Sequence, residues 1–337
     1  MSAGHNAQLP EAAQRPLVAV VTPVYNGAAQ LQRCIESVLA QSYVNWQYII
    51  GNNCSTDGTL AIAARYAASD DRISVHTYGE FVGAERSHNL SLRLVPPGCK
   101  YIKLVFADDW LFPECLQQMV ELAECHPSIG IVGAYGLLGR RIAWDGLPYE
   151  TTVVTGREIC RARLLGGDYV FGTPTSLLMR ADLVVGRDDF YNEANEHSDT
   201  EACFDLLRTC DFGFVHQVLT YTHQDERSLT AESRRVNSYL PGFLYDLRTY
   251  GPHFLSTQEL EERTRQVLSN YYEFLARSLL RREGKGFFDY HAAKLSDLGM
   301  PLERARLMRR VAALLVDAAL NPKRTLENLR SQRAAPP

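Results

Sequence analysis

Four short apolar runs alternate with polar loops and with stretches of helical spacing in the first third of the chain. Each run has the length of a buried strand, and the runs cover Leu17–Val21, Trp46–Ile50, Ile73–Tyr78 and Tyr101–Phe106. Continuous apolar runs of this length are typical of parallel strands buried on both faces. The repeated order of strand, polar loop and helix predicts an α/β fold with a doubly wound, mostly parallel sheet. Its loops should open on one edge.

The fourth run ends in two adjacent carboxylates, Asp108 and Asp109, and a helix is expected to start near Pro113. In open α/β sheets, ligands bind at the carboxyl ends of the strands. Two carboxylates at that edge suit a hard cation, Mg²⁺ or Mn²⁺, of the kind that bridges a substrate diphosphate. The alternative is that the pair only caps the following helix and turns the chain.

Composition indicates an ordinary globular protein. Of the 337 residues 46% are hydrophobic, and the net charge of −4 does not suggest a nucleic-acid partner. No stretch approaches the roughly 20 apolar residues of a membrane span. The eight cysteines form no CxxC pair and several lie among apolar residues, as reduced core thiols do. We therefore expect a cytoplasmic protein, with residues 1–15 as a disordered N-terminal tail.

A change of composition near residue 231 predicts a second region made of amphipathic helices. They are expected at 239–250, 257–282, 286–298 and 302–320, with breaks at Pro252, Gly284 and Pro301. Basic residues gather around the last helix, namely Arg304, Arg306, Arg309, Arg310, Lys323 and Arg324. Such a helix can lie on an anionic membrane at the inner face of the cell, or it can pack on the catalytic domain or on a homodimer partner.

Four motifs at successive strand ends carry a resemblance to a known family. They are TPVYNG from Thr22, NNCSTDGT from Asn52, GAERSHN from Gly83 and FADDW from Phe106. Together they resemble the nucleotide-sugar half of the family 2 inverting glycosyltransferases of GT-A fold, over roughly residues 16–230. The resemblance implies sugar transfer from a nucleotide-diphosphate sugar to a carbohydrate or lipid-linked glycan acceptor, with Mn²⁺ or Mg²⁺. Bacterial surface polysaccharide or glycolipid synthesis is the expected setting.

The resemblance also implies roles for particular residues. The expected donor-binding residues are Thr22, Pro23, Val24, Tyr25, Asn52, Asp57, Arg86, Asn89, Ala107 and Asp108, and the expected metal ligands are Asp108, Asp109 and His223. The sequence departs from the family pattern at three of the motif positions. Asn52 stands where the family usually has an aspartate that contacts the base, Phe106 replaces the first acid of the metal motif, and His88 stands where an arginine is common. Asp57 has an alternative role as a helix cap.

A second acidic segment, Asn195–Glu201, precedes a helix expected at Ala202–Cys210. The family places its catalytic base at such a helix start, and the resemblance implies Asp199 in that role. An inverting transfer needs one carboxylate to accept the proton of the attacking hydroxyl. The alternative is that Asp199 only caps the helix. The loop Asp168–Thr175 is expected at the acceptor pocket, and Arg227 near the diphosphate.

Two other classes of protein fit parts of the pattern. A sugar-phosphate nucleotidyltransferase would carry a Gly-rich, basic phosphate loop after the first strand, and Thr22–Gly27 is not of that kind. A non-catalytic nucleotide-sugar-binding module remains open because acids are absent at Asn52, Phe106 and Ser198.

Overall fold

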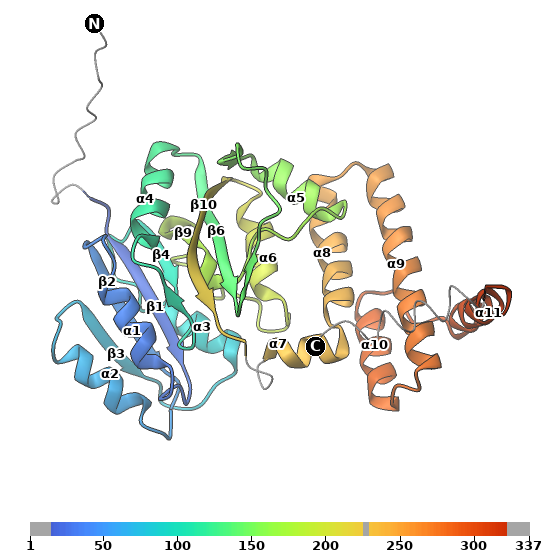
Figure 1. Ribbon diagram of the computed structural model, residues 1–337, viewed down its shortest axis with the longest axis horizontal. Helices are drawn as coiled ribbons and strands as arrows, with labels where there is room; N and C mark the ends of the chain where they lie inside the picture. The colour runs from blue at the N-terminus through green and yellow to red at the C-terminus, as the bar shows by residue number, and fades with distance from the viewer. Residues whose placement is uncertain (1–14, 225–228, 322–337) are drawn as a thin grey trace, which may run out of the picture. The chain divides into compact units, whose positions relative to one another are not determined.

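The computed structural model describes residues 15–224 and 229–321, which fall into two compact units, residues 1–228 and residues 229–337. Figure 1 shows strands and helices in the first unit and helices in the second. The first 14 residues of the predicted tail lie outside the described residues, as do Arg227, Lys323 and Arg324.

The first unit begins with four parallel strands in the order β3-β2-β1-β4. These are β1 (Val18–Val24), β2 (Trp46–Asn52), β3 (Ile73–Thr77) and β4 (Tyr101–Leu104). The connecting helices are α1 (Leu31–Leu39), α2 (Thr59–Ala67) and α3 (Ala84–Leu92). This arrangement confirms the predicted α/β fold and brings the loops after the strands to one edge.

The sheet continues with strands of both directions, in the order β4-β9-β6-β10-β5. Strands β6 (Ile129–Leu138) and β10 (Asp211–Thr222) are parallel, whereas β9 (Leu178–Arg180) is antiparallel to β4 and β6. The short strands β5 (Trp110–Leu111), β7 (Arg141–Ala143) and β8 (Val153–Val154) are also antiparallel to their neighbours. The helices are α4 (Cys115–Cys125), α5 (Gly156–Leu164) and α6 (Ser198–Leu206), with 3₁₀ turns η2 (Pro174–Ser176) and η3 (Ala181–Leu183).

Several element boundaries differ from the prediction. Strand β1 continues through Pro23 to Val24, because parallel pairing with β2 extends as far as Val24 opposite Asn52. Helix α6 begins at Ser198, four residues before the expected Ala202, so that Asp199 lies within its first turn. Pro252 lies inside helix α8 rather than at a break.

The core of the first unit forms where α1 and α4 pack on the sheet. Alternate residues of β1, Val18 and Val20, join one cluster with the apolar face of α1, which includes Leu31 and Ile35. The same core contains an unexpected residue, since the side chain of Lys103 in β4 is 0% exposed.

The second unit is helical. It comprises α7 (Leu229–Val236), α8 (Tyr239–Phe254), α9 (Thr257–Leu280), α10 (Lys285–Asp297) and α11 (Arg304–Leu320). Ser256 and Glu259 form a capping box at the start of α9. Inside the unit, the buried imidazole of His291 shares a 2.6 Å hydrogen bond with the hydroxyl of Tyr271. In the described part of the chain, no helix combines the length and apolarity needed to span a bilayer.

Candidate active site

The loops that follow β1 and β2 are joined by hydrogen bonds at the carboxyl edge of the sheet. The backbone N–H of Asn26 donates to Ser55 Oγ at 2.9 Å, and Thr56 N–H donates to Asn26 Oδ1 at 2.8 Å. A Cβ on Gly27 would lie 2.6 Å from a Val24 methyl, so only glycine allows this close approach. The two loops therefore form one preorganised rim.

Asp57 belongs to this rim. Its carboxylate accepts hydrogen bonds from the backbone N–H groups of Thr59 at 3.0 Å and Ala28 at 3.1 Å. The Thr59 hydroxyl also donates to this carboxylate, and this bond, together with the two backbone bonds, lowers the pKa of Asp57. The residue thus fixes the start of α2 and ties it to the first loop, as the capping alternative predicts, while its side chain stays exposed at the edge.

Three of the residues expected to bind the donor point into the protein. Thr22 is fully buried, donates to the carbonyl of Val105 at 2.7 Å and shares a 2.9 Å hydrogen bond with Tyr48. Pro23 and Val24 are also buried in β1. Their side chains thus have a structural role in the strand, and their predicted place beside the donor stays a prediction. Tyr25 differs, because its ring is 49% exposed at the end of β1.

Asn52 is buried at the end of β2. Its amide nitrogen donates to Thr77 Oγ1 at 3.2 Å and its oxygen accepts from Ser55 N–H at 3.2 Å. Both ends of this side chain therefore hold the loop, and its expected contact with the base stays a prediction. The neutral amide suits a site from which water is excluded, where a carboxylate would be costly.

The acidic pair after β4 has two different environments. Asp109 is 2% exposed, and its two oxygens accept from Thr175 Oγ1 at 2.6 Å and from His223 N–H at 2.9 Å. Burial, with the nearby charge of Asp108, raises the pKa of Asp109 to about 7. Asp108 and Ala107 are partly exposed. Asp109 thus holds the acidic loop against the end of β10, and its role as a metal ligand stays a prediction.

The donor set at this edge fits a divalent cation that is held mainly by substrate. Among the residues that the structure describes, no three His, Cys, Asp or Glu side chains gather as a cation site. Mg²⁺ commonly uses one or two carboxylates together with substrate phosphates and water. Asp108 would supply the protein carboxylate, while His223 lies beside the pair through its backbone bond to Asp109.

Two of the departures from the family pattern contact each other. The imidazole of His88 stacks on the ring of Phe106, with centroids 5.0 Å apart and planes inclined by 21°. Burial lowers the pKa of His88 to about 4, so the ring is neutral at pH 7. Tyr191 packs against His88 edge-on at 5.8 Å. A row of rings therefore runs from the acidic loop toward α6.

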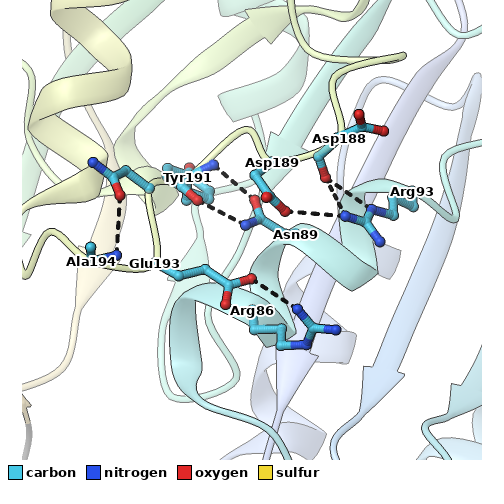
Figure 2. Close-up of polar contacts among 9 residues, drawn as sticks. Arg86, Asn89, Arg93, Asp188, Asp189, Tyr191, Glu193 and Ala194 are labelled. Carbon is cyan, nitrogen blue, oxygen red and sulfur yellow. Dashed lines mark hydrogen bonds and ion pairs between the residues drawn. The ribbon is translucent and has the colours of Figure 1, made fainter.

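Helix α3 holds the loop that leads toward α6, as Figure 2 shows. Asn89 Nδ2 donates to the carbonyl of Tyr191 and Asn89 Oδ1 accepts from Tyr191 N–H, each at 2.8 Å. Arg86 forms a 3.5 Å ion pair with Glu193, and Arg93 Nε donates to the carbonyl of Asp188 at 3.1 Å. The buried carboxamide of Asn89 thus holds this loop, whereas Arg86 is half-exposed. Contact of either residue with the donor stays a prediction.

Asp199 lies in the first turn of α6. Desolvation raises the pKa of its carboxyl, while the hydrogen bond from Thr200 N–H at 2.7 Å opposes that rise. Burial and the charge of Asp199 raise the pKa of Tyr169 and of Tyr191, so the Asp199 carboxyl lies close to both rings. The neighbouring Glu201 accepts from Asn192 and Asn195 and fixes the preceding loop. Asp199 therefore has the chemistry of a proton acceptor beside an aromatic wall.

Sequence reasoning missed two residues that support the acidic loop. Thr175 donates to Asp109 and accepts from Phe106 N–H at 3.1 Å, and it lies in a segment predicted only as a general acceptor loop. Lys103 is buried in β4 with its ammonium 3.4 Å from Met119 Sδ, and its charge lowers the pKa of Asp109. For Lys103, the sequence feature that could have been noticed is a lysine inside an otherwise apolar strand.

Comparisons with known proteins agree with this geometry. Residues 19–185 match the model of the family described as "Glycosyl transferase family 2". The putative glycosyltransferase EpsE of Bacillus subtilis is 33% identical over 160 residues, which cover 44% of this chain and 56% of EpsE. The putative teichuronic acid biosynthesis glycosyltransferase TuaG of the same organism is 34% identical over 137 residues, covering 40% and 52%. The chain thus spans about half the length of these relatives.

Solved structures show the same fold at low sequence identity. Residues 1–349 of S. aureus TarS in complex with UDP superpose with a TM-score of 0.63 at 14% identity, covering 90% of this chain and 91% of that one. The mannosyltransferase PcManGT of Pyrobaculum calidifontis, in complex with GDP-Man and Mn²⁺, gives 0.52 at 15% identity, covering 94% and 89%. Through the domain that contains the four loops, the chain belongs to glycosyl transferase family 2.

Proposed function

We propose that this protein transfers a sugar from a nucleoside-diphosphate donor to an acceptor hydroxyl with inversion at the anomeric carbon. One observation carries the proposal. The partly exposed carboxylate of Asp108 follows β4, and a separate, desolvated carboxylate, Asp199, begins α6. A row of rings runs from Phe106, in the loop of Asp108, through His88 to Tyr191, whose pKa is raised by burial and by the charge of Asp199.

The two carboxylates suit the two ends of an in-line displacement. The acceptor oxygen forms a bond to the anomeric carbon while the bond from that carbon to the diphosphate oxygen breaks. Asp199 receives the proton of the acceptor hydroxyl, and its raised pKa makes it a better base than an ordinary aspartate. Asp108 would hold a Mg²⁺ or Mn²⁺ ion, which when bound neutralises the charge that develops on the departing diphosphate.

The names and titles of the relatives support a class of donor and a class of acceptor. The titles of neighbouring structures name UDP, UDP-GlcNAc and GDP-Man as bound ligands, which supports a nucleotide-sugar donor here. The name of TuaG refers to teichuronic acid biosynthesis. We accordingly propose a carbohydrate or lipid-linked glycan acceptor, in the synthesis of a bacterial surface polysaccharide or glycolipid.

The test is release of nucleoside diphosphate from UDP-, GDP- and dTDP-sugars, measured with Mn²⁺ and with EDTA. We expect slow hydrolysis of one donor that is lost with EDTA and in Asp108→Asn. Asp182→Asn, which changes an exposed carboxylate paired with Arg180, should retain it. Metal-dependent binding without turnover in the presence of candidate acceptors would support the binding-module class instead. Absence of both binding and turnover would overturn the proposal.

The last helix supports a surface contact as part of the same proposal. Met308, Leu315 and Val316 of α11 are all more than half exposed, and Arg304 and Arg309 on this helix are exposed as well. An amphipathic basic helix suits an anionic bilayer that carries a lipid-linked acceptor. Co-sedimentation with anionic vesicles, reduced in Leu315→Asp, tests this contact, and a concentration-dependent dimer without vesicle binding would indicate a second copy instead.

A further inference from the structure

The phenol of Tyr169 joins two segments of the first unit. Its hydroxyl donates to the carbonyl of Gly172 at 3.0 Å, and its oxygen lies 2.9 Å from Thr200 Oγ1 in the first turn of α6. A phenol has a single proton to donate, and a carbonyl oxygen can only accept. The proton of Tyr169 is therefore used on Gly172, so the hydroxyl of Thr200 donates to the Tyr169 oxygen.

The surroundings hold the Tyr169 hydroxyl in this place. Gly172 has a φ of +73°, which glycine adopts readily, and a Cβ there would lie 3.1 Å from the indole of Trp144. The Tyr169 ring packs edge-on against Phe171 with centroids 5.8 Å apart, and the guanidinium carbon of Arg163 lies 5.2 Å from the ring centroid. The contacts of the ring do not involve its oxygen, so they survive removal of the hydroxyl alone.

Thr200 follows Asp199, the proposed general base. The Asp199 carboxylate accepts from Thr200 N–H at 2.7 Å, whereas Thr200 Oγ1 lies 3.5 Å from the same oxygen, at the outer limit of a hydrogen bond. A hydroxyl proton directed at Tyr169 cannot also serve the carboxylate at that distance. The Thr200 side chain therefore leaves Asp199 to its backbone donor. The Asp199 side chain is partly exposed, so a substrate hydroxyl can reach it.

Other ionisable groups near Asp199 come from several segments. Desolvation raises the pKa of Asp199, and the charge of His197, just before α6, opposes that rise. Tyr191 in the preceding loop and Cys203 on α6 lie close by, and Arg163 of α5 lies beyond the Tyr169 ring. A further hydrogen bond donated to the charged carboxylate would favour the charged form. The direction of the Thr200 hydroxyl therefore sets how strongly Asp199 binds a proton.

We propose that Tyr169 is a positioning residue for Asp199, because it draws the Thr200 hydroxyl away and leaves the carboxylate available for the proton of the acceptor. The inference rests on the proposed function. A carboxylate that already accepts a hydroxyl bond is a weaker base, since the charged form is the one that this bond stabilises. Tyr169 acts through Thr200 rather than on the reacting atoms.

The test measures proton binding by Asp199 directly, without any substrate. The full chain is isotopically labelled at its aspartate carboxyl carbons, NMR follows their signals against pH, and Asp199→Asn assigns the signal. In Tyr169→Phe the Thr200 hydroxyl loses its acceptor and turns to Asp199, so the proton affinity of Asp199 should fall about tenfold. Thr200→Val alone should titrate close to the wild type, because this hydroxyl does not serve the carboxylate in the native site.

The double variant separates this mechanism from a general disturbance of the site. Tyr169→Phe combined with Thr200→Val should titrate like Thr200→Val, because the hydroxyl that would reach Asp199 is missing. A loss of proton affinity that persists in the double variant would overturn the inference, and so would an unchanged titration in Tyr169→Phe. Tyr101→Phe is the matched control, since it removes a hydroxyl that bonds Glu124 at the start of β4, and it should leave the Asp199 signal unchanged.

Turnover separates the inference from the proposed function. With Mn²⁺ and the nucleotide sugar that the wild type hydrolyses, the acidic limb of the pH profile for nucleoside-diphosphate release should follow the Asp199 titration. In Tyr169→Phe this limb should move to lower pH. If the titrations change as expected but no donor is turned over, the proposed function fails while the hydrogen-bond assignment stands. An acidic limb that stays in place although the titration moves would overturn Asp199 as the base, and with it the role of Tyr169.

Discussion

The carboxamide of Asn89 pairs with the backbone of Tyr191 through two hydrogen bonds of 2.8 Å, across 102 residues of sequence. The pairing imitates the exchange of N–H and C=O bonds between neighbouring strands. It connects α3, in the predicted donor half, with the loop that leads toward α6 and Asp199 (Figure 2). A family motif residue in this chain thus acts on the position of the predicted base.

Asn89→Ala should therefore lower kcat for sugar transfer while leaving the KM for the donor nearly unchanged. Loss of two buried hydrogen bonds leaves the Tyr191 backbone groups unsatisfied, which costs about 1–3 kcal/mol each in the free energy of unfolding. Steady-state kinetics and urea unfolding measure the two effects. A raised donor KM with normal kcat would contradict this role and indicate that Asn89 contacts the donor. Arg93→Ala, at the exposed end of the same loop contact, is the matched control.

Asp199→Asn should reduce the transfer rate by about 10²–10⁴-fold, the usual contribution of a general base. In the wild type, the carboxyl must be deprotonated to accept a proton. Since its pKa is raised, the rate should increase with pH through that raised value, so the acidic limb lies above the ordinary aspartate range. Glu201→Gln should lower stability through Asn192 and Asn195 yet keep the acidic limb in place. If the acidic limb of the pH profile moved in Glu201→Gln instead, Asp199 would not be the general base.

The stacked pair of His88 and Phe106 predicts coupled effects of mutation. Phe106→Asp alone places a carboxylate against a neutral imidazole and two residues before Asp108, and should lower the free energy of unfolding by about 1–3 kcal/mol. Adding His88→Arg supplies a cation at contact distance and should recover about 0.5–3 kcal/mol in a double-mutant cycle. If the losses in the free energy of unfolding of the two single variants simply added in the double variant, residues 88 and 106 would not be energetically coupled.

His291 predicts a pH dependence of stability in the helical unit. Burial among aromatic rings lowers its pKa to about 4, below the ordinary histidine value of about 6.5. The unfolded chain therefore binds the extra proton first, so the free energy of unfolding should fall as pH drops from 6.5 to 4. His291→Gln, which keeps an acceptor for Tyr271, should flatten the pH profile of Tm over this range. His253→Gln, at an exposed position on α8, should leave the slope intact.

Most of the fold was predictable because its signal is local. Apolar runs of strand length and helical spacing identify β1 to β4 and α1 to α3, and the order of motifs identifies the family. The antiparallel strand β9, inserted between β4 and β6, was not predictable. Strand β9 has only three residues, which is too few to show a period of two, and its pairing depends on strands distant in sequence.

The motifs predicted the strand ends on which the candidate site residues lie, but not the hydrogen-bond partners of their side chains. Asp108 and Tyr25 lie partly exposed at the expected edge, whereas Thr22, Asn52 and Asn89 have the expected positions but direct their polar atoms at the protein. A motif fixes the backbone position of a residue and not the partner of its side chain. Thr175 had no signal of its own, since its hydrogen bond to Asp109 joins residues that are distant in the sequence.

The acidic loop is followed by a stack that gives the protein an intrinsic optical probe. The indole of Trp110, next to Asp109, lies 3.4 Å from the ring of Tyr221, and the guanidinium carbon of Arg33 lies 3.2 Å over its other face. Only three tryptophans occur in the chain, and Trp46 is buried under Arg72 in the core. Emission from Trp110 therefore responds to any rearrangement of the loop it follows. Replacing the other two tryptophans with phenylalanine would let stopped-flow fluorescence time events at the carboxyl edge without an added label.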